Sequence, residues 1–202
     1  MIIKPEQLKL ILDQNLDQGH KFCPPLPNIG ENTKQPAAVL IPLFQDHGIW
    51  NLLFIKRAHH KNDHHSGQIA FPGGRTDQVD TTLMDTALRE AAEEIGIDPG
   101  DVEILGQSCP ITTVTNYEVT PIVGILPWPY TLTLSKIEVD RIITIPIAWL
   151  ADPNNHQIKS WRSPLDPAQG IPVIFFNDYE GETLWGVTAQ IVMDFLEIIQ
   201  MS

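Results

Sequence analysis

The strongest constraint on the fold lies in residues 71–97, which read FPGGRTDQVDTTLMDTALREAAEEIGI. This segment joins a Gly-Gly pair to a stretch, from Leu83 to Ile95, in which apolar residues recur with helical spacing. Gly96 is well placed to end the helix, because glycine readily adopts the left-handed conformation that follows a last helical turn. We therefore predict a strand over GQIAF, a glycine turn, and a helix over residues 83–95.

Runs rich in β-branched residues surround this helix and are bounded by turn residues. They predict strands over residues 37–44, 49–57, 101–107, 117–126, 141–150 and 171–177, the first two of them forming a hairpin. A second helix is expected over residues 188–200, and residues 1–36 are expected to form an amphipathic helix followed by a proline-rich arm. This mixture predicts one α/β domain over residues 1–202, with helices covering the faces of a sheet.

Composition excludes several classes of protein. The net charge of −12 argues against a broad electrostatic grip on nucleic acid, because such a grip needs lysines and arginines that neutralise phosphates. No apolar run approaches the ~20 residues that a membrane helix needs, and the N-terminal residues are too charged for a signal peptide. The two cysteines lack a metal-binding spacing, so a disulfide framework is not expected and a cytoplasmic protein is the default. A single bridge between Cys23 and Cys109 stays open.

The predicted helix carries three glutamates, Glu90, Glu93 and Glu94, whose three- and four-residue steps place them on one face. Their like charges repel unless a cation relieves them, and Arg89 alone cannot offset three of them. Mg²⁺ suits such a face, since it commonly uses one or two carboxylates together with water and substrate phosphates. Taken alone, REAAEE is also typical of a solvated helix surface. The preceding Gly73-Gly74 pair favours a functional site, because glycine lets the backbone approach phosphate or metal closely.

These residues resemble the Nudix box, the signature of hydrolases that cleave nucleoside diphosphates linked to another moiety. The resemblance lies in Gly74, the RTDQV that follows it, Asp80, and the run REAAEEIGI that begins at Arg89. The chain departs from the general pattern at two points: the usual Glu is Asp80, and the spacer to Arg89 is one residue longer. Both departures are similar to the coenzyme A pyrophosphatase branch. The upstream run from Leu52, LLFIKRAHHKNDHHSGQIAFPGG, is also similar to that branch, with Asp63 where the pattern has Arg.

The resemblance implies an α/β/α sandwich of the Nudix type, with a mixed sheet and the carboxylate-bearing helix at its centre. It implies that Glu90 and Glu94 bind Mg²⁺ or Mn²⁺, with the carbonyl of Gly74 as a further ligand. Glu93 would be an additional ligand or the general base, and Arg89 would orient these groups by pairing with Glu93 or Asp80. The metal would polarise a phosphoryl oxygen and lower the pKa of a bound water. The implied reaction converts coenzyme A or acyl-coenzyme A to 3′,5′-ADP and 4′-phosphopantetheine or its acyl form.

Other side chains near the glycine turn are candidates for binding the substrate. Cationic groups could hold its phosphates, with a solvated surface as the alternative, at Lys56, Arg57 and Arg75. Gly73 and Gly74 would admit a phosphate, and His65 resembles a family motif, H-x-G, that could contact the substrate. The neighbouring histidines, His59, His60, His64 and His65, do not predict zinc, because adjacent side chains diverge and no further well-spaced ligand accompanies them.

Two further features have structural and functional alternatives. The run TVTNY, residues 113–117, is either a turn held by Thr and Asn hydrogen bonds or a loop that reads the substrate. Trp149, Trp161 and Trp185 could each stack on an adenine, but packing in the core or in an interface is the more common use of tryptophan.

The alternatives for function differ in substrate and in class. Within the same enzyme class, the substrate could be ADP-ribose, NADH, a nucleotide sugar or an oxidised nucleotide. Outside it, the chain could be a catalytically silent module that recognises a nucleotide, although such a module has no need for three clustered glutamates. An acidic scaffold would leave the glycine pair unexplained. A small-molecule substrate is the expected partner, and the N-terminal arm and helix could also serve a homodimer.

Overall fold

The computed structural model describes residues 7, 10–11, 34–59, 66–163 and 166–199. The helix and arm predicted over residues 1–36 therefore lie mostly outside the described residues, although Gln7, Leu10 and Ile11 are helical. The first strand begins at Gln35, two residues before the predicted start of the strand at residue 37.

In the described part of the chain, eight strands form one mixed sheet with the order β3-β2-β1-β7-β5, while β4 pairs with β1, β6 with β7 and β8 with β2. The sheet is mixed because β1 runs parallel to β7, whereas its other pairings are antiparallel. The strands are β1 (Gln35–Asp46), β2 (Ile49–Arg57), β3 (Ile69–Ala70), β4 (Gly73–Arg75), β5 (Glu103–Gln107), β6 (Ile111–Thr112), β7 (Tyr117–Ile125) and β8 (Val139–Pro146).

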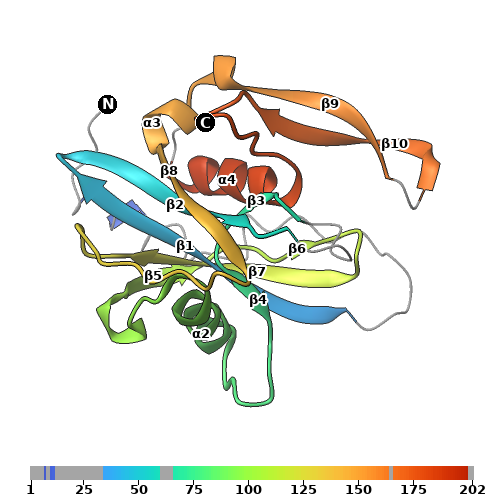
Figure 1. Cartoon of the computed structure of the whole chain (residues 1–202). Coiled ribbons are helices and arrows are strands. Elements are labelled where there is room, and N and C mark those ends of the chain that lie inside the picture. The colour runs from blue at the N-terminus through green and yellow to red at the C-terminus, as the bar shows by residue number, and fades with distance from the viewer. Residues whose placement is uncertain (1–6, 8–9, 12–33, 60–65, 164–165, 200–202) are drawn as a thin grey trace.

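Two long helices cover opposite faces of this sheet, α2 (Leu83–Ile95) and α4 (Gly186–Ile198), as Figure 1 shows. Alternate residues of β2 serve the two sides: Leu53 and Ile55 are buried with α2, whereas Leu52 and Phe54 are buried with α4. The described residues thus form an α/β/α sandwich, which confirms the predicted fold class. None of the described helices is long and apolar enough to cross a membrane.

The predicted hairpin between β1 and β2 is confirmed. His47 and Gly48 form its turn with φ of 46° and 81°, and Asp46 pairs with Ile49 on either side. Two successive residues with positive φ match the twist of paired strands, which explains why a short turn rich in Gly suffices here.

The central helix α2 begins and ends where the sequence predicts. Thr82 caps its N-terminus by accepting from the Asp85 N–H, while the Asp85 carboxylate accepts from the Thr82 N–H. Gly96 ends it with φ of 72°, and its N–H donates to the carbonyl of Ala92. Short 3-10 turns, η1 (Pro99–Asp101) and η2 (Pro153–Asn155), follow α2 and α3 (Ile147–Leu150) respectively.

Two predicted boundaries are wrong. The strand expected over residues 141–150 ends at Pro146, and Ile147–Leu150 form the short helix α3. Proline has no N–H to extend the ladder, and its fixed φ suits the start of a helix. The glycine turn is also a strand, since Gly73–Arg75 pair with β1 as β4. A strand of three residues, two of them glycine, carries no β-rich sequence pattern.

Beyond α3 the chain forms a two-stranded ribbon, β9 (His156–Ser163) and β10 (Asp166–Phe176), which projects from the sandwich in Figure 1. The sequence predicts only the second strand, because β9 is largely polar. The tryptophans pack among aromatic neighbours: Trp185 stacks on Phe175 with ring centroids 5.4 Å apart and lies 5.8 Å from Trp161. Trp149 similarly contacts Phe176 and Tyr179. The packing alternative therefore accounts for these rings.

Two smaller features were also left open by the sequence. Residues Thr113 to Tyr117 form a turn, in which Asn116 has φ of 65° and the Tyr117 N–H donates to the Thr113 hydroxyl. Cys109 is disulfide-bonded, and the other cysteine of the sequence, Cys23, lies outside the described residues. A bridged cysteine departs from the reduced thiols expected of a cytoplasmic protein.

Candidate active site

The site begins with a line of side chains along α2. Thr86, Glu90 and Glu94 follow one another in four-residue steps and so lie one turn apart on the same side of the helix. Glu94 is only 4% exposed, and its Oε2 accepts a hydrogen bond of 2.9 Å from the Gly73 N–H. Glu90 lies one turn earlier, against Gly74. The helix thus presents two carboxylates to the glycine strand β4.

Both glycines are required by close packing. A Cβ on Gly74 would lie 2.6–2.7 Å from the carboxylate atoms of Glu90. A Cβ on Gly73, whose φ is 153°, would lie 2.4 Å from the Ala38 carbonyl oxygen and 2.5 Å from Val39 Cα. The pair therefore lets β4 fit between β1 and the carboxylates of α2, a role more specific than the turn predicted from the sequence.

Arg89 connects the acidic groups around α2. Its Nε and Nη2 donate to the two oxygens of Asp80, each at 2.9 Å, in a bidentate pair. Nη1 donates to Glu90 at 3.0 Å and to Glu93 at 3.3 Å, and Nη2 also donates to the Arg75 carbonyl at 3.1 Å. The five N–H groups of the guanidinium therefore all find acceptors. The sequence left pairing with Glu93 or Asp80 open, and the structure contains both.

The surroundings of these carboxyl groups shift their pKa values in different directions. Hydrogen bonds from Arg89 hold the pKa of Asp80 well below its usual range. Burial raises the pKa of Glu94 to about 8, against the opposing effects of the Gly73 N–H and the Arg57 charge. Burial likewise raises the pKa of Glu90. Glu90 and Glu94 are therefore carboxylates whose charged form lacks sufficient compensation within the described residues.

Glu138 is a further acidic residue of the site that the sequence analysis missed. Its charge raises the pKa of both Glu90 and Glu94. Two backbone hydrogen bonds hold its loop there: the Ala58 N–H donates to the Glu138 carbonyl, and the Ser135 N–H donates to the Glu94 carbonyl. Glu138 belongs to no recognisable motif, so only the folded chain reveals its position.

The other predicted residues are not all brought together. Glu93 is 57% exposed and contacts Arg89 rather than β4. Lys56 donates to Glu182 at 2.6 Å and lies on the face of the sheet opposite Arg57, which acts on Glu94. Arg75 is exposed at the end of β4.

Most of the histidines for which the sequence does not predict zinc binding lie outside the described residues. His60, His64 and His65 lie outside the described residues, so the predicted contact of His65 with substrate also stays a prediction. His59 is described, and its ring packs against Gly67, where a Cβ would lie 2.6 Å from the ring.

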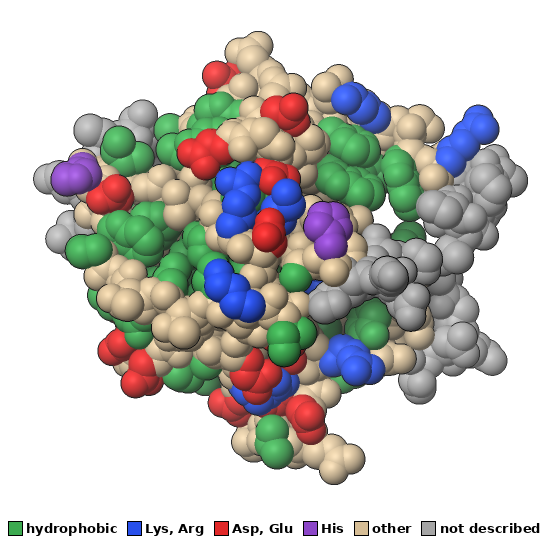
Figure 2. All heavy atoms as spheres, in the orientation of Figure 1, with side chains coloured by type: hydrophobic (Ala, Val, Ile, Leu, Met, Phe, Trp, Pro, Cys, Tyr) green, Lys and Arg blue, Asp and Glu red, His purple; other side chains and the backbone are tan. Residues whose placement is uncertain are grey.

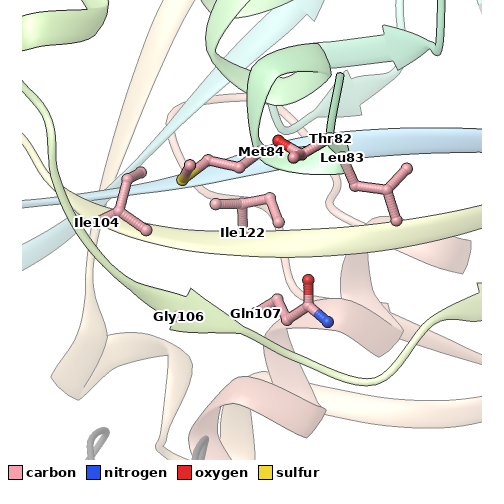
Figure 3. A pocket seen from close by; sticks show the side chains of 7 residues that line it. All are labelled: Thr82, Leu83, Met84, Ile104, Gly106, Gln107 and Ile122. Carbon is pink, nitrogen blue, oxygen red and sulfur yellow. The ribbon is translucent and has the colours of Figure 1, made fainter. Parts of the chain in front are cut away.

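A pocket of about 320 Å³ lies at the other end of α2, as Figure 3 shows. Its walls come from the first turn of the helix and from β5 and β7 and are mainly apolar: Thr82, Leu83, Met84, Ile104, Gly106, Gln107 and Ile122. With a rise of 1.5 Å per residue, Leu83 is roughly 16 Å along the helix axis from Glu94. This pocket contains none of the predicted site residues.

The donor set fits a divalent ion of the magnesium type. Within the described ranges, no three His, Cys, Asp or Glu residues are grouped closely enough to hold a metal ion by themselves. Glu90 and Glu94, however, offer carboxylate oxygens in a partly buried acidic site, where burial raises the pKa of both and a nearby cation would oppose that effect. Mg²⁺ commonly binds through one or two carboxylates and completes its shell with water and substrate phosphate. In Figure 2, acidic side chains with basic ones between them gather around the loop that leads into α2.

Residues 33–167 match the NUDIX domain family, which is well over half of the 202 residues. The chain therefore belongs to the Nudix hydrolases, enzymes that act on phosphoric anhydride bonds in small nucleotide-type substrates and generally need divalent metal ions. The resemblance to the Nudix family stated from the sequence is thus confirmed, as is the enzyme class, whereas the coenzyme A branch stays a prediction.

Two relatives extend this likeness over nearly the whole chain. The protein named "Uncharacterized Nudix hydrolase NudL" in Escherichia coli O7:K1 is 35% identical over 190 residues, which cover 94% of this chain and 95% of that protein. The protein of the same name in Salmonella paratyphi B is 35% identical over 188 residues, covering 92% and 93%.

A solved structure supports the fold. The crystal structure of a MutT/nudix family protein from Enterococcus faecalis aligns with 99% of this chain and 76% of its own, at a TM-score of 0.53. Since the two sequences are 15% identical, this likeness concerns the fold alone.

Proposed function

We propose that this Nudix hydrolase uses Mg²⁺ or Mn²⁺ to cleave the pyrophosphate bond of coenzyme A or acyl-coenzyme A. The observation that carries the metal-dependent mechanism is the pair of carboxylates, Glu90 and Glu94, packed against the Gly73–Gly74 strand. The products would be 3′,5′-ADP and 4′-phosphopantetheine or its acyl form.

Glu90 and Glu94 would hold the metal, with the Gly74 carbonyl as a further ligand. When bound, the ion would polarise a phosphoryl oxygen, neutralise the charge that develops as the P–O bond breaks, and acidify a water molecule. Arg89 keeps Glu90 in position, since its Nη1 donates to Glu90 at 3.0 Å.

Two carboxylates are candidates for the general base. Glu93 is exposed and held only by long contacts to Arg89 within the described part of the chain, so it is free to reorient toward a water molecule. Glu138 is exposed and acts electrostatically on both proposed ligands. A base must come within hydrogen-bond reach of the attacking water, so the loss of activity on replacing each of these two glutamates by glutamine would distinguish them.

The substrate phosphates would be held by cationic and backbone groups near β4. Arg57, whose charge acts on Glu94, and the exposed Arg75 are the side chains best placed for this role. Lys56 is a weaker candidate than the sequence implies, because Glu182 holds it on the opposite face. Gly73 has already committed its N–H to Glu94, so a phosphate would have to compete with that bond.

The choice of coenzyme A rests on the sequence around the site. The run from Leu52 to Gly74 is similar to the upstream signature of the coenzyme A branch, and Asp80 with its longer spacer is similar to the same branch. The described residues of this run lie in β2, β3 and the start of β4; Gly73 and Gly74 of β4 lie against Glu94 and Glu90, and the charge of Arg57 in β2 acts on Glu94. A segment that recognises the substrate must lie beside the reacting groups.

Product analysis by mass spectrometry tests the proposal. Purified protein would be incubated with Mg²⁺ and, separately, with coenzyme A, ADP-ribose, NADH, a nucleotide sugar and 8-oxo-dGTP. We expect release of 4′-phosphopantetheine and 3′,5′-ADP, its loss in EDTA, and its return with excess Mg²⁺ or Mn²⁺. Cleavage of another compound alone would exclude coenzyme A, and hydrolysis that resists the chelator would contradict the metal-dependent mechanism.

A further inference from the structure

We propose that Thr86 is a positioning residue of this site, and that it works together with Asp80 as a matched pair. Through Asp80, the buried Thr86 hydroxyl would set the orientation of Arg89 and hence the positions of Glu90 and Glu93. The inference rests on the proposed function for its effect on turnover, but its structural part can be measured without any substrate.

The first step concerns Thr86 itself. Its side chain is fully buried on the first turns of α2, with 0% exposure. The hydroxyl donates to Asp80 Oδ2 at 2.9 Å and lies 3.3 Å from the Thr76 hydroxyl and 3.4 Å from the Thr82 carbonyl. A hydroxyl has one hydrogen, and donation to the ionised carboxylate is the shortest and strongest of these contacts.

The second step concerns Asp80, whose side chain is 3% exposed. Its Oδ2 accepts from the Asp77 N–H at 2.8 Å, from Thr86 and from Arg89 Nη2, while Oδ1 accepts from Arg89 Nε. Four donors from three residues therefore surround one carboxylate. Of these three residues, Thr86 is the one that lies on the same side of α2 as Glu90 and Glu94.

The third step leads to the acidic groups. The guanidinium of Arg89 is planar, so fixing Nε and Nη2 on Asp80 also fixes the direction of Nη1. Nη1 then lies between Glu90 and Glu93, at 3.0 Å and 3.3 Å. Rotation of Asp80 would turn the whole guanidinium, and the contact between Arg89 and Glu90 would change first.

The fourth step explains why aspartate is the fitting residue here. The spacer between this acid and Arg89 is one residue longer than in the general signature, and the shorter aspartate is enclosed by donors at 2.8–2.9 Å. A glutamate is one methylene longer and has no open space to extend into. Asp80→Glu, although it restores the usual residue of the signature, should therefore disturb the site.

The test compares Thr86→Val, which removes the hydroxyl at nearly constant volume, with Thr86→Ser, which keeps it. Thr115→Val serves as the control, because it removes an exposed hydrogen bond between the Thr113 and Thr115 hydroxyls, which involves neither Asp80 nor Arg89. Loss of one buried charge-assisted hydrogen bond corresponds to about a tenfold effect. We expect Thr86→Val and Asp80→Glu to lower kcat about tenfold or more, with KM changed less, and Thr86→Ser to restore most of kcat. A lower Tm with unchanged kcat in Thr86→Val would overturn the proposal.

A second measurement keeps the inference testable if the protein hydrolyses none of the substrates. The exchange rate of the Arg89 Nε–H with solvent can be followed by nitrogen-15 NMR in metal-free protein. We expect this proton to exchange about tenfold faster in Thr86→Val than in the wild type, and at nearly the wild-type rate in Thr86→Ser and Thr115→Val. Equal exchange in Thr86→Val and wild type would overturn the positioning role whatever the activity.

Discussion

At the residue scale, Glu94 is the most unusual group of the site. It is a glutamate on the buried side of a helix, with one backbone hydrogen bond and two other acidic side chains acting on it. Its pKa of about 8 lies above the ordinary value of 4.5, so the metal-free protein holds a proton on this residue at neutral pH. A divalent ion bound at the proposed site would displace that proton, and it would then stabilise the folded chain in addition to its proposed role in catalysis.

Glu94→Gln should change how the stability of the metal-free protein depends on pH. The folded state keeps the Glu94 proton up to about pH 8, whereas the unfolded chain loses it near 4.5. The free energy of unfolding of the wild type therefore falls as pH rises between these values, and glutamine removes this penalty. The Tm of each protein would be measured by calorimetry in EDTA at pH 5 and at pH 8.5. We expect the Tm of Glu94→Gln minus that of the wild type to be at least about 3 °C larger at pH 8.5 than at pH 5.

Glu103→Gln, which alters an exposed carboxyl in β5, is the matched control and should show no such gain. A Tm difference between Glu94→Gln and wild type that stays constant with pH would show that Glu94 is already ionised at neutral pH.

At the element scale, the site depends on how closely α2 approaches β4. The helix is anchored at both ends, by the Thr82 cap and by Gly96, whose αL conformation leaves no room for a side chain beside Thr133. Between these ends, Gly73 and Gly74 let the carboxylates lie against the strand backbone. The carboxylate geometry is therefore a property of the helix and the strand together.

Gly74→Ala should impair the site without unfolding the protein. The added methyl would lie 2.6–2.7 Å from the Glu90 carboxylate, which must move away from β4 and from Arg89. We expect kcat/KM to fall at least about tenfold, which is about 1.4 kcal/mol of transition-state stabilisation, while the far-ultraviolet circular dichroism spectrum is unchanged.

Gly100→Ala is the control for a Gly-to-Ala change, since a Cβ there meets only the Asp98 carboxylate, at 3.3 Å, in the 3-10 turn after α2. Wild-type kcat/KM in Gly74→Ala would mean that the Glu90 carboxylate does not need its place beside β4.

At the scale of the whole molecule, an acidic chain of net charge −12 concentrates carboxylates at the place where an anionic substrate is proposed to react. A divalent ion at the proposed site would offset this negative charge locally, because it would lower the repulsion among Glu90, Glu94 and Glu138 and attract phosphate. The rest of the surface need not be basic.

Binding of Mg²⁺ or Mn²⁺ should therefore raise the thermal stability of the whole protein. At a metal concentration 100 times the Kd, the gain is about 2.7 kcal/mol, or roughly 5–10 °C in Tm for a chain of this size. Differential scanning fluorimetry measures the shift, and EDTA should reverse it. Sodium chloride at equal ionic strength controls for screening of the net charge. The double substitution Glu90→Gln and Glu94→Gln should abolish the shift; a shift that survives it would place the metal elsewhere.

The amino-acid sequence alone determined the local structure of this protein. Apolar spacing and capping residues predicted α2 to its last residue, and the turn at His47–Gly48 predicted the hairpin, because both depend on neighbours a few positions away. The same spacing, with the glycine pair, indicated an acidic metal site, and the resemblance to the Nudix box implied its type. Sequence patterns were weaker for β4, β9 and α3, whose short or polar segments form through contacts with distant parts of the chain.

Only the tertiary structure decided which of the glutamate side chains are buried at the site and which are exposed. Glu90, Glu93 and Glu94 have equivalent places in the sequence pattern, yet packing against β4 buries Glu94 and leaves Glu93 exposed beside Arg89. Strand pairing likewise places Lys56 on the face opposite the site, and the turn that leads into β8 brings in Glu138. Periodicity fixes the direction of a side chain relative to its own element, whereas its surroundings depend on which distant elements pack there.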